Sequence, residues 1–314
     1  KIEKDYDRNL ILIFEGDKEF CEYISEDGKK LIATMIEKEE FTGKKGETLS
    51  VNFLQNGKLI SMDILGFGKK EECSENIFRE VLFKYLSGKS GAILISSNRE
   101  ELNRADLICE IVGNINYSFD EFKEKKSNKV DVEFFSSEAI DITESLILNE
   151  ATDVTRNLVD LPANIINPIT LSERVIGLGK EFGFEVEIFD DEKIQKLGMN
   201  LLYSVGKASA TKPRLIVMRY FGDRESEDIM GLVGKGLTYD TGGLCIKPAD
   251  SMMNMKDDMT GGATVIGTMC AIAKNALKKN VVAVVPACEN AINGNSYRPG
   301  DIIQSMNGKY VEII

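Results

Sequence analysis

The most informative stretch of the chain is VGKGLTYDTGGLCIKPADSMMNMKDDMTGGAT, which runs from Val233 to Thr264. It is too irregular for one helix and too polar for a buried strand. The apolar run before it, residues 228–233, predicts a buried strand that ends where the glycines begin. In open α/β sheets ligands bind at the carboxyl ends of the strands, and glycines let the backbone approach a ligand or ion closely. The stretch therefore predicts a catalytic site, and the charged candidates in it are Lys235, Asp240, Lys247 and Asp258.

These side chains are suited to holding a metal ion. Asp240 and Asp258 can converge on a divalent cation, because such cations prefer oxygen ligands. Lys235 can join them only as the neutral amine, a form that burial and the charge of the cation favour. Lys247 can stay protonated and orient or polarise a substrate. The alternative is that both lysines are solvated loop charges, since a Gly-Lys-Gly tripeptide is by itself a weak signal.

Composition limits the class of protein. At 314 residues the chain is longer than one typical core, so two domains are expected. No run approaches the roughly 18 apolar residues of a membrane span, and no signal peptide opens the chain. The six cysteines form no CxxC pair, which indicates reduced thiols. We therefore expect a cytoplasmic protein that does not associate with a membrane.

The charged and titratable residues exclude further classes. No histidine is present, which rules out Ser-His-Asp and Cys-His catalysis and any zinc site that needs imidazole. A metal must then be held by carboxylates, carbonyl oxygens, water or an amine. The net charge of −12 argues against a grip on nucleic acid, so no nucleic-acid partner is expected.

The first half of the chain predicts a small N-terminal α/β domain over residues 1–136. An Asn-Gly pair at 56–57 predicts a hairpin, and Ser74 is the expected cap of a helix that reaches Leu86. A long amphipathic helix over 137–161 should link this domain to the next. The strands are expected at 9–14, 48–54, 59–66, 92–95 and 130–135, and the helices at 30–41, 74–86 and 104–112.

The second half predicts a larger C-terminal α/β catalytic domain over residues 162–314. Apolar strands alternate with helices there, which favours a mostly parallel central sheet covered on both faces. Thr170 is the expected cap of the first helix. The strands are expected at 184–189, 201–205, 213–220, 228–233 and 281–286, and the helices at 171–182, 191–197 and 261–275.

From about Asn149 to Ile314 the sequence resembles the leucyl (cytosol) aminopeptidase family. The matching pieces, in order, are TRNLVDLPAN from Thr155, VGKGLTYDTGGLCIKP from Val233, MKDDMTGGA from Met255 and ENAINGNSYRPGDIIQSMNGKYVEI from Glu289. Each piece is moderately specific alone, and in this order and spacing they are highly specific.

The resemblance implies a metal-dependent aminopeptidase that releases N-terminal, leucine-like apolar residues from peptide substrates and assembles as a homo-hexamer. By the same resemblance Lys235, Asp240 and Asp258 are metal ligands, with Asp240 shared between two divalent ions, Mn²⁺ or Zn²⁺. Lys247 matches the catalytic lysine that polarises the scissile carbonyl. Met255 matches a position that lines the pocket for the first side chain of the substrate, although a lone methionine is more often core filler. Two such cations activate a bridging water, and a free amine bound to the metal explains the restriction to N-termini.

The sequence also departs from the family pattern. The family continues after Val311-Glu312-Ile313 into an Asn-Thr-Asp-Ala-Glu-Gly-Arg segment that carries two more carboxylate ligands and a catalytic arginine, whereas this sequence stops at Ile314. Two cations that each take about four to six ligands are not filled by three side chains. The other nearby carboxylates are Glu289, Asp301 and Glu312, of which Asp301 reads better as a turn residue. Residues 1–314 alone are therefore expected to be inactive.

Two other functions stay open. A catalytically inactive fragment or scaffold protein with the same fold would show no tight metal site in a titration. A nucleic-acid-binding role, which some members of the family add, would show salt-dependent retention on DNA.

Overall fold

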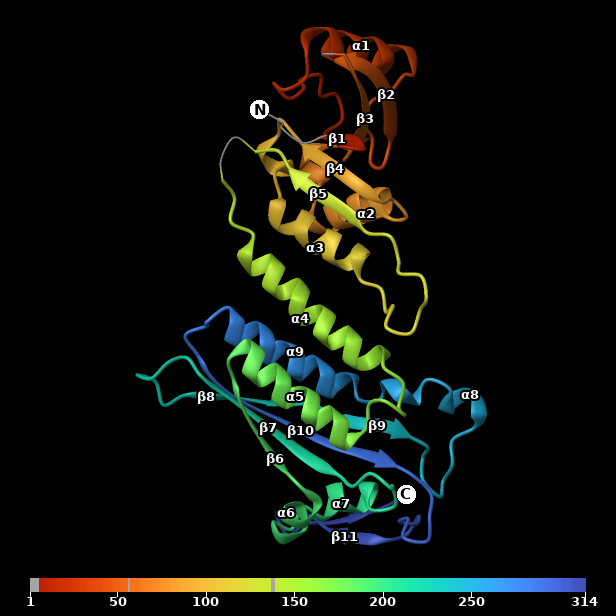
Figure 1. Cartoon of the computed structure of the whole chain (residues 1–314), viewed down its shortest axis with the longest axis vertical. Helices are drawn as coiled ribbons and strands as arrows, with labels where there is room; N and C mark the ends of the chain where they lie inside the picture. The colour runs from red at the N-terminus through yellow and green to blue at the C-terminus, as the bar shows by residue number, and fades with distance from the viewer. Residues whose placement is uncertain (1–5, 56, 137–138) are drawn as a thin grey trace. The chain divides into compact units, whose positions relative to one another are not determined.

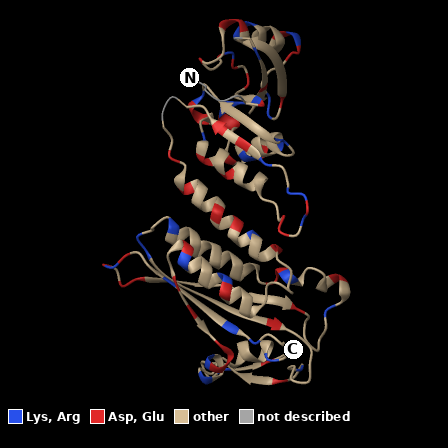
Figure 2. Cartoon of the chain, viewed as in Figure 1, with Lys and Arg blue, Asp and Glu red and all other residues tan. Residues whose placement is uncertain are grey.

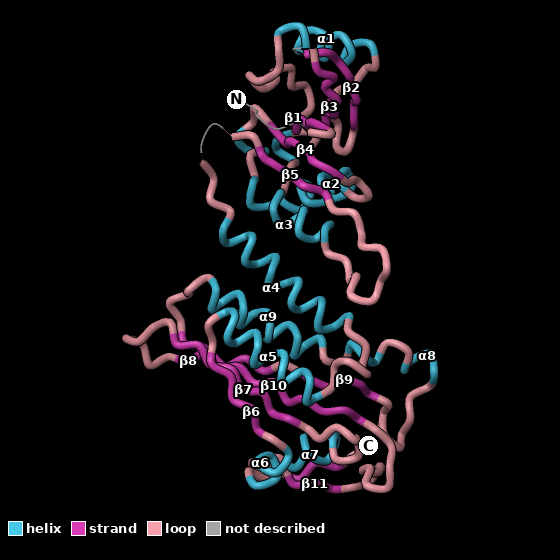
Figure 3. Tube along the Cα trace, in the orientation of Figure 1, coloured by secondary structure: helices cyan, strands magenta, loops and turns pink. Residues whose placement is uncertain are grey.

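The computed structural model of the protein describes residues 6–55, 57–136 and 139–314. Two compact units make up the chain, Lys1–Asn149 and Glu150–Ile314. Both units combine strands with helices, as Figure 3 shows. The expected α/β class, with an N-terminal α/β domain followed by a second one, is confirmed.

Unit 1 is built on a five-stranded sheet in the order β2-β3-β1-β4-β5. β1 pairs in parallel with β3 and β4, β4 pairs in parallel with β5, and β2 runs antiparallel to β3. The strands are β1 Arg8–Ile13, β2 Thr48–Gln55, β3 Lys58–Gly66, β4 Gly91–Ser96 and β5 Val130–Phe134. The helices are α1 Glu26–Lys38, α2 Glu75–Leu86 and α3 Ala105–Asn116, with short 3-10 turns η1 Lys70–Glu72 and η2 Glu100–Leu102.

Two local features of unit 1, the connection between β2 and β3 and the start of α2, form as expected from the sequence. Gln55 pairs with Lys58 across the β2–β3 turn, and Gly57 takes the positive φ of 78° that such a tight turn requires. Asn56 of this turn lies outside the described residues. Ser74 caps α2, since its hydroxyl accepts a hydrogen bond from the Ile77 amide at 3.4 Å.

The sheet of unit 1 has a core on each face, because successive residues of a strand point to opposite sides. Leu10 and Leu12 of β1 pack with α2 and α3 in one cluster, whereas Ile11 and Ile13 pack with α1 in the other. α1 therefore lies on one face and α2 with α3 on the other, as can be followed in Figure 1.

The linking helix is α4, Thr143–Asp160, and the division between the two units falls within it. The expected start at Ser137 lies outside the described residues. Residues 139–142, also expected in this helix, are not helical, and Asp141 Oδ1 there accepts a hydrogen bond from the Thr143 amide at 2.9 Å. In its second half the Thr155 hydroxyl donates to the Ala263 carbonyl at 3.3 Å, which ties this part of α4 to unit 2.

Unit 2 has a sheet in the order β6-β7-β10-β8, with β9 also paired to β10. β10 is parallel to β8 and β9 and antiparallel to β7, which is itself antiparallel to β6. The strands are β6 Glu185–Phe189, β7 Arg214–Phe221, β8 Ile229–Val233, β9 Gly236–Asp240 and β10 Asn280–Asn290, with a separate hairpin of β11 Ile302–Gln304 and β12 Tyr310–Glu312. The helices are α5 Pro168–Phe182, α6 Asp191–Lys196, α7 Asn200–Gly206, α8 Ala249–Met252 and α9 Thr260–Lys274, with a 3-10 turn η3 Met255–Asp257.

Helices cover both faces of this sheet. Leu215 and Val217 of β7 pack with Ile194 of α6 and residues of α7. On the other face α5 and α9 lie against the sheet, as Figure 1 shows. The near-continuous apolar run of β10 is consistent with this double cover, since its residues are largely buried.

Three local predictions for unit 2 are wrong. Residues 201–205, expected as a strand, belong to helix α7, because a short apolar run fits a buried helix turn as well as a strand. α5 is capped by Asn167, with Pro168 at its first position and the Thr170 side chain completing a capping box. Strand β8 forms as expected but is not buried. Val233 is 75% exposed, because β8 pairs only with β10 among the described strands and so lies at an edge.

All six cysteines are free thiols, as expected from their spacing. Within the described residues no helix is both long and apolar enough to cross a bilayer.

Candidate functional site

The site is built at the junction of β8, β9 and α9. Lys235 stands between β8 and β9, Asp240 is the last residue of β9, and Asp258 follows η3 just before α9. The Gly262 amide in the first turn of α9 donates a hydrogen bond of 2.7 Å to the Lys235 carbonyl. This bond ties the start of α9 to the residue that carries one candidate ligand.

Glycines allow this close approach of backbone to backbone. A Cβ on Gly262 would lie 2.8 Å from Val285 Cγ1 and 2.9 Å from the Lys235 oxygen. A Cβ on Gly234 would lie 2.5 Å from the Gly261 oxygen. These contacts show that Gly234 and Gly262 let two elements of the protein meet closely.

A second pair of glycines turns the chain back toward Asp240. Gly242 and Gly243 take positive φ values of 83° and 72°, which most other residues avoid. The Lys247 amide then donates to the Thr241 carbonyl at 2.9 Å, which closes the loop. As a result Lys247, which is seven residues after Asp240 in the chain, lies next to the end of β9.

Two lysine–carboxylate pairs result. Lys247 Nζ lies 2.8 Å from Asp240 Oδ2, and Lys235 Nζ lies 2.9 Å from Asp258 Oδ1. The first pair is the more enclosed, with the Asp240 side chain 15% exposed, whereas the Lys235 side chain is 61% exposed. All four charged candidates from the sequence are thus paired with one another in one region of unit 2.

Asp240 is held ionised by its neighbours. Its Oδ1 accepts hydrogen bonds from the Gly242 amide at 2.9 Å and from Asn290 Nδ2 at 2.8 Å. Burial raises the pKa of this carboxyl, but the hydrogen bonds from Lys247, Gly242 and Asn290 outweigh burial and lower it overall. The hydrogen bond to Asp240 raises the pKa of Lys247 against the opposing effect of burial. Lys247 is therefore an ammonium in this arrangement.

Cys288 lies among these charges without sharing their chemistry. Burial and the nearby carboxylate of Asp240 raise the pKa of its thiol to about 12. Because the thiolate is the reactive form, Cys288 is inert as a nucleophile at neutral pH.

Met255 lies beside the lysine of the first pair. It is the first residue of η3, and its sulfur lies 2.9 Å from Lys247 Nζ. The side chain is therefore placed at the site and is not enclosed in a distant core. Its role in a substrate pocket stays a prediction.

Asn290 is the residue that sequence reasoning missed. It ends β10 and is paired in register with Asp240, and it is 4% exposed. Its Nδ2 also donates to the Tyr297 hydroxyl at 3.1 Å, whereas its buried Oδ1 has no hydrogen-bond partner among the described residues. Exchanging the two amide atoms would set oxygen against the Asp240 carboxylate, so this orientation is the favourable one. The available signal in the sequence is its place just after the apolar run of β10.

The other carboxylates considered lie elsewhere. Glu289 accepts a hydrogen bond from the Thr211 hydroxyl at 3.1 Å, and Glu312 is exposed in β12. Asp301 accepts from the Arg298 amide at 2.9 Å, as a turn residue does. Among the described residues no three His, Cys, Asp or Glu side chains gather where they could hold a metal ion.

The donors present fit part of a metal site. Asp240 and Asp258 offer hard oxygen ligands, and Lys235 adds an amine beside Asp258. The unpartnered Oδ1 of Asn290 leaves one further buried acceptor next to Asp240. These groups cannot complete two coordination shells of about four to six ligands each.

Comparison with known proteins gives consistent matches. Residues 153–314 match the family model described as the cytosol aminopeptidase family, catalytic domain, and residues 11–126 match the N-terminal domain of that family. A protein of Fusobacterium nucleatum, described as a probable cytosol aminopeptidase, is 42% identical over 100% of this chain and 66% of its own length. One of Aquifex aeolicus with the same description is 39% identical over 96% of this chain and 64% of its own.

Solved structures agree. The cytosol aminopeptidase of Coxiella burnetii superposes with a TM-score of 0.78 at 25% identity, covering 99% of this chain and 65% of its own. The bottromycin maturation enzyme BotP in complex with Mn superposes with a TM-score of 0.79 at 24% identity, covering 98% of this chain and 65% of its own, and shows the fold alone. The chain spans just under two thirds of the length of the relatives it matches.

Proposed function

Because the chain belongs to the cytosol aminopeptidase family, we propose that the protein is a metal-dependent aminopeptidase that removes N-terminal residues from peptides. The observation that carries this proposal is the meeting of Lys235, Asp240, Lys247 and Asp258 at the end of β9, inside the residues that match the catalytic domain.

Lys235, Asp240 and Asp258 would hold two divalent cations, Mn²⁺ or Zn²⁺, together with ligands beyond those of the described residues. Cations at such a site supply Lewis acidity, which makes water a nucleophile at neutral pH. Asn290 and the Gly242 amide fix one oxygen of Asp240, so that its other oxygen is the one free to exchange partners.

Lys247 would act on the substrate. Its ammonium is held protonated by Asp240, so it can donate a hydrogen bond to the oxygen of the scissile carbonyl, where negative charge develops. Met255, in contact with Lys247, would line the pocket for the first side chain of the peptide. A thioether accommodates apolar groups of varied shape, which agrees with a leucine-like preference.

We also propose assembly as a homo-hexamer and a cytoplasmic location. Membership of the family and the free thiols of the cysteines support them. Lys and Arg are scattered among more numerous Asp and Glu residues in both units (Figure 2), which disfavours nucleic acid as a partner.

The test compares two substrates that differ only at the amine. Leucine p-nitroanilide and its N-acetyl derivative are incubated with Mn²⁺ and the protein purified from its own cells, called here the cellular form. The polypeptide of residues 1–314 is assayed in parallel. We expect hydrolysis of the free amine alone by the cellular form. We expect none by residues 1–314, since three donor side chains hold two cations incompletely. Hydrolysis of the acetylated substrate, or hydrolysis unaffected by a chelator, would reject the proposal.

A scaffold protein with the same fold is the second candidate. It is favoured only by the small number of metal donors among the described residues. Absence of hydrolysis by the cellular form, together with absence of a metal site, would select it.

A further inference from the structure

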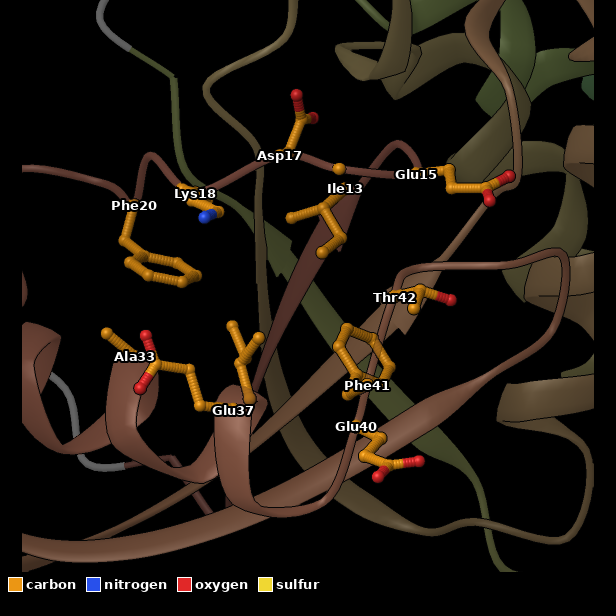
Figure 4. Close-up of a pocket in the computed structure, with 12 residues that line it drawn as sticks. Ile13, Glu15, Asp17, Lys18, Phe20, Ala33, Glu37, Glu40, Phe41 and Thr42 are labelled. Atoms are coloured by element: carbon orange, nitrogen blue, oxygen red, sulfur yellow. The ribbon is translucent and has the colours of Figure 1, made fainter.

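Unit 1 contains a cavity that takes no part in the site described above. It has a volume of ≈ 510 Å³ and lies between the loop after β1, helix α1 and the segment that follows α1. Ile13, Phe20, Ile36 and Phe41 line it, and Figure 4 shows the two phenylalanines around the hollow with Ile13 between them. Cavities of this size with apolar and aromatic walls are typical of sites for small organic molecules.

The cavity also lies where α/β folds bind ligands. It opens at the carboxyl end of β1, whose last residue, Ile13, is part of its wall. In the order β2-β3-β1-β4-β5 the chain places β3 on one side of β1 and β4 on the other, and the helices after β1 and β4 lie on opposite faces. The position between β1 and β4 is therefore a topological switch point, and open α/β sheets bind ligands in the crevice next to such a point.

The charges around the cavity select the kind of ligand. Asp17 is engaged within the fold, because its carboxylate pairs with Arg99 and accepts from the Phe14 amide at 2.9 Å. Within the part of the chain that the structure describes, the carboxylates of Glu15, Glu37 and Glu40 have neither an ion pair nor a hydrogen bond.

Lys18 is the basic side chain among the residues that line the cavity, and it too has no partner among the described residues. Against three unpaired carboxylates it leaves an excess of negative charge beside the apolar wall. A ligand with an ammonium group can reach one of these carboxylates, whereas a carboxylate ligand would be repelled.

We propose that this cavity binds a small organic cation, in which a primary ammonium group is attached to an apolar body. The body would fill the space between Phe20 and Phe41, and the ammonium would face Glu37. Phenylalanine and simple arylalkylamines share this chemistry, and they differ in whether a carboxylate is also present for Lys18. The site belongs to unit 1 alone, so its failure would leave the proposed hydrolysis untouched.

The experiment uses ligands of one body and different charge. Calorimetric titration of the 314-residue polypeptide compares 2-phenylethylamine, 3-phenylpropionate and phenylalanine. We expect the amine to bind at least about tenfold more tightly than the propionate. If phenylalanine binds as tightly as 2-phenylethylamine, free amino acids are the natural class of ligand. If phenylalanine binds much more weakly, amines without a carboxylate are the natural class. Both results agree with the proposal.

Variants then assign the binding to the cavity. Glu37→Gln should weaken the amine roughly three- to tenfold. Glu39→Gln, the matched control at the exposed end of the same helix but outside the cavity lining, should leave it unchanged. Lys18→Gln should strengthen amine binding, because it removes a like charge.

One further variant separates binding from folding. Glu40 is a non-glycine residue with a positive φ of 51°, so Glu40→Gly removes a carboxylate and also relieves the backbone. We expect weaker amine binding together with a higher melting temperature. The proposal is overturned if no amine binds, if the propionate binds as well as the amine, or if Glu37→Gln and Glu39→Gln behave alike.

Discussion

Gly262→Ala tests whether close backbone contact sets the geometry of the candidate site. Gly262 is buried in the first turn of α9 and donates its amide to the Lys235 carbonyl at 2.7 Å. Its new Cβ would lie 2.8 Å from Val285 Cγ1 and 2.9 Å from the Lys235 oxygen. Ordinary carbon contacts are about 3.5–4.0 Å, so the backbone of α9 or of Lys235 must move by roughly 1 Å.

Two opposing effects set the magnitude. Alanine in place of glycine favours a helix by roughly 0.5–1 kcal/mol. Overpacking of this kind costs about 1–3 kcal/mol. The net expectation is a loss of about 1–2 kcal/mol, which in a unit of this size lowers the melting temperature by roughly 2–8 °C. The Lys235–Asp258 pair, now at 2.9 Å, should separate, and Mn²⁺ binding should weaken.

Two control variants isolate the contact. Gly261→Ala changes the neighbouring residue of the same helix turn, where the nearest atom to the new Cβ is Lys235 N at 3.3 Å. Gly177→Ala in α5 meets nothing within 4 Å and should stabilise by roughly 0.5–1 kcal/mol. Thermal melts followed by circular dichroism and Mn²⁺ titrations are measured on all three. If Gly262→Ala is as stable as Gly261→Ala and binds Mn²⁺ equally well, the close contact does not hold the site together.

Three other perturbations have distinct outcomes. In the metal-loaded cellular form, Lys247→Met should lower kcat for leucine p-nitroanilide about 10²–10³-fold, since a donor to the carbonyl oxygen is lost, and an unchanged kcat would remove Lys247 from the reaction. Asn290→Ala should cost about 1–3 kcal/mol in urea unfolding, because a buried hydrogen bond to Asp240 is lost, and no change would mean that Asp240 is held by other groups. Burial raises the pKa of Asp63, but its hydrogen bonds and the charge of Arg8 outweigh burial and lower the pKa overall. The stability that Asp63 contributes is therefore present above the unfolded carboxyl pKa of about 3.9, and it is lost as the pH falls through the lower pKa of the folded state. Asp63→Asn should accordingly flatten the acid side of the stability profile of unit 1, and an unaltered profile would contradict this.

Much of the fold could be predicted because local signals agreed with the tertiary context. The tight connection between β2 and β3, the Ser74 cap and the apolar run of β10 are each announced by a sequence pattern that fits only one local structure. Residues 201–205 carry no such signal, since five apolar or small residues fit a strand and a helix turn equally. The exposure of β8 depends on which strands lie beside it, and a single strand does not encode that.

The candidate site was predictable for its charged members. Lys235, Asp240, Lys247 and Asp258 could be named from the glycine-rich stretch, but their pairing could not, because it depends on the turn at Gly242 and Gly243. Asn290 escaped because its role comes from the register of β10 against β9. The cavity of unit 1 has no motif, since its walls come from residues that in sequence look like ordinary core.

Mn²⁺ binding, followed by electron paramagnetic resonance, tests most directly whether this region of unit 2 holds divalent cations. The wild-type protein is compared with Asp240→Asn, Asp258→Asn and the control Asp301→Asn, whose carboxylate serves a turn. Binding that weakens at least about tenfold in the first two variants and stays unchanged in the control is expected for direct ligands. Equal Mn²⁺ binding by all four proteins, or no binding by any, would contradict a metal site at Asp240 and Asp258.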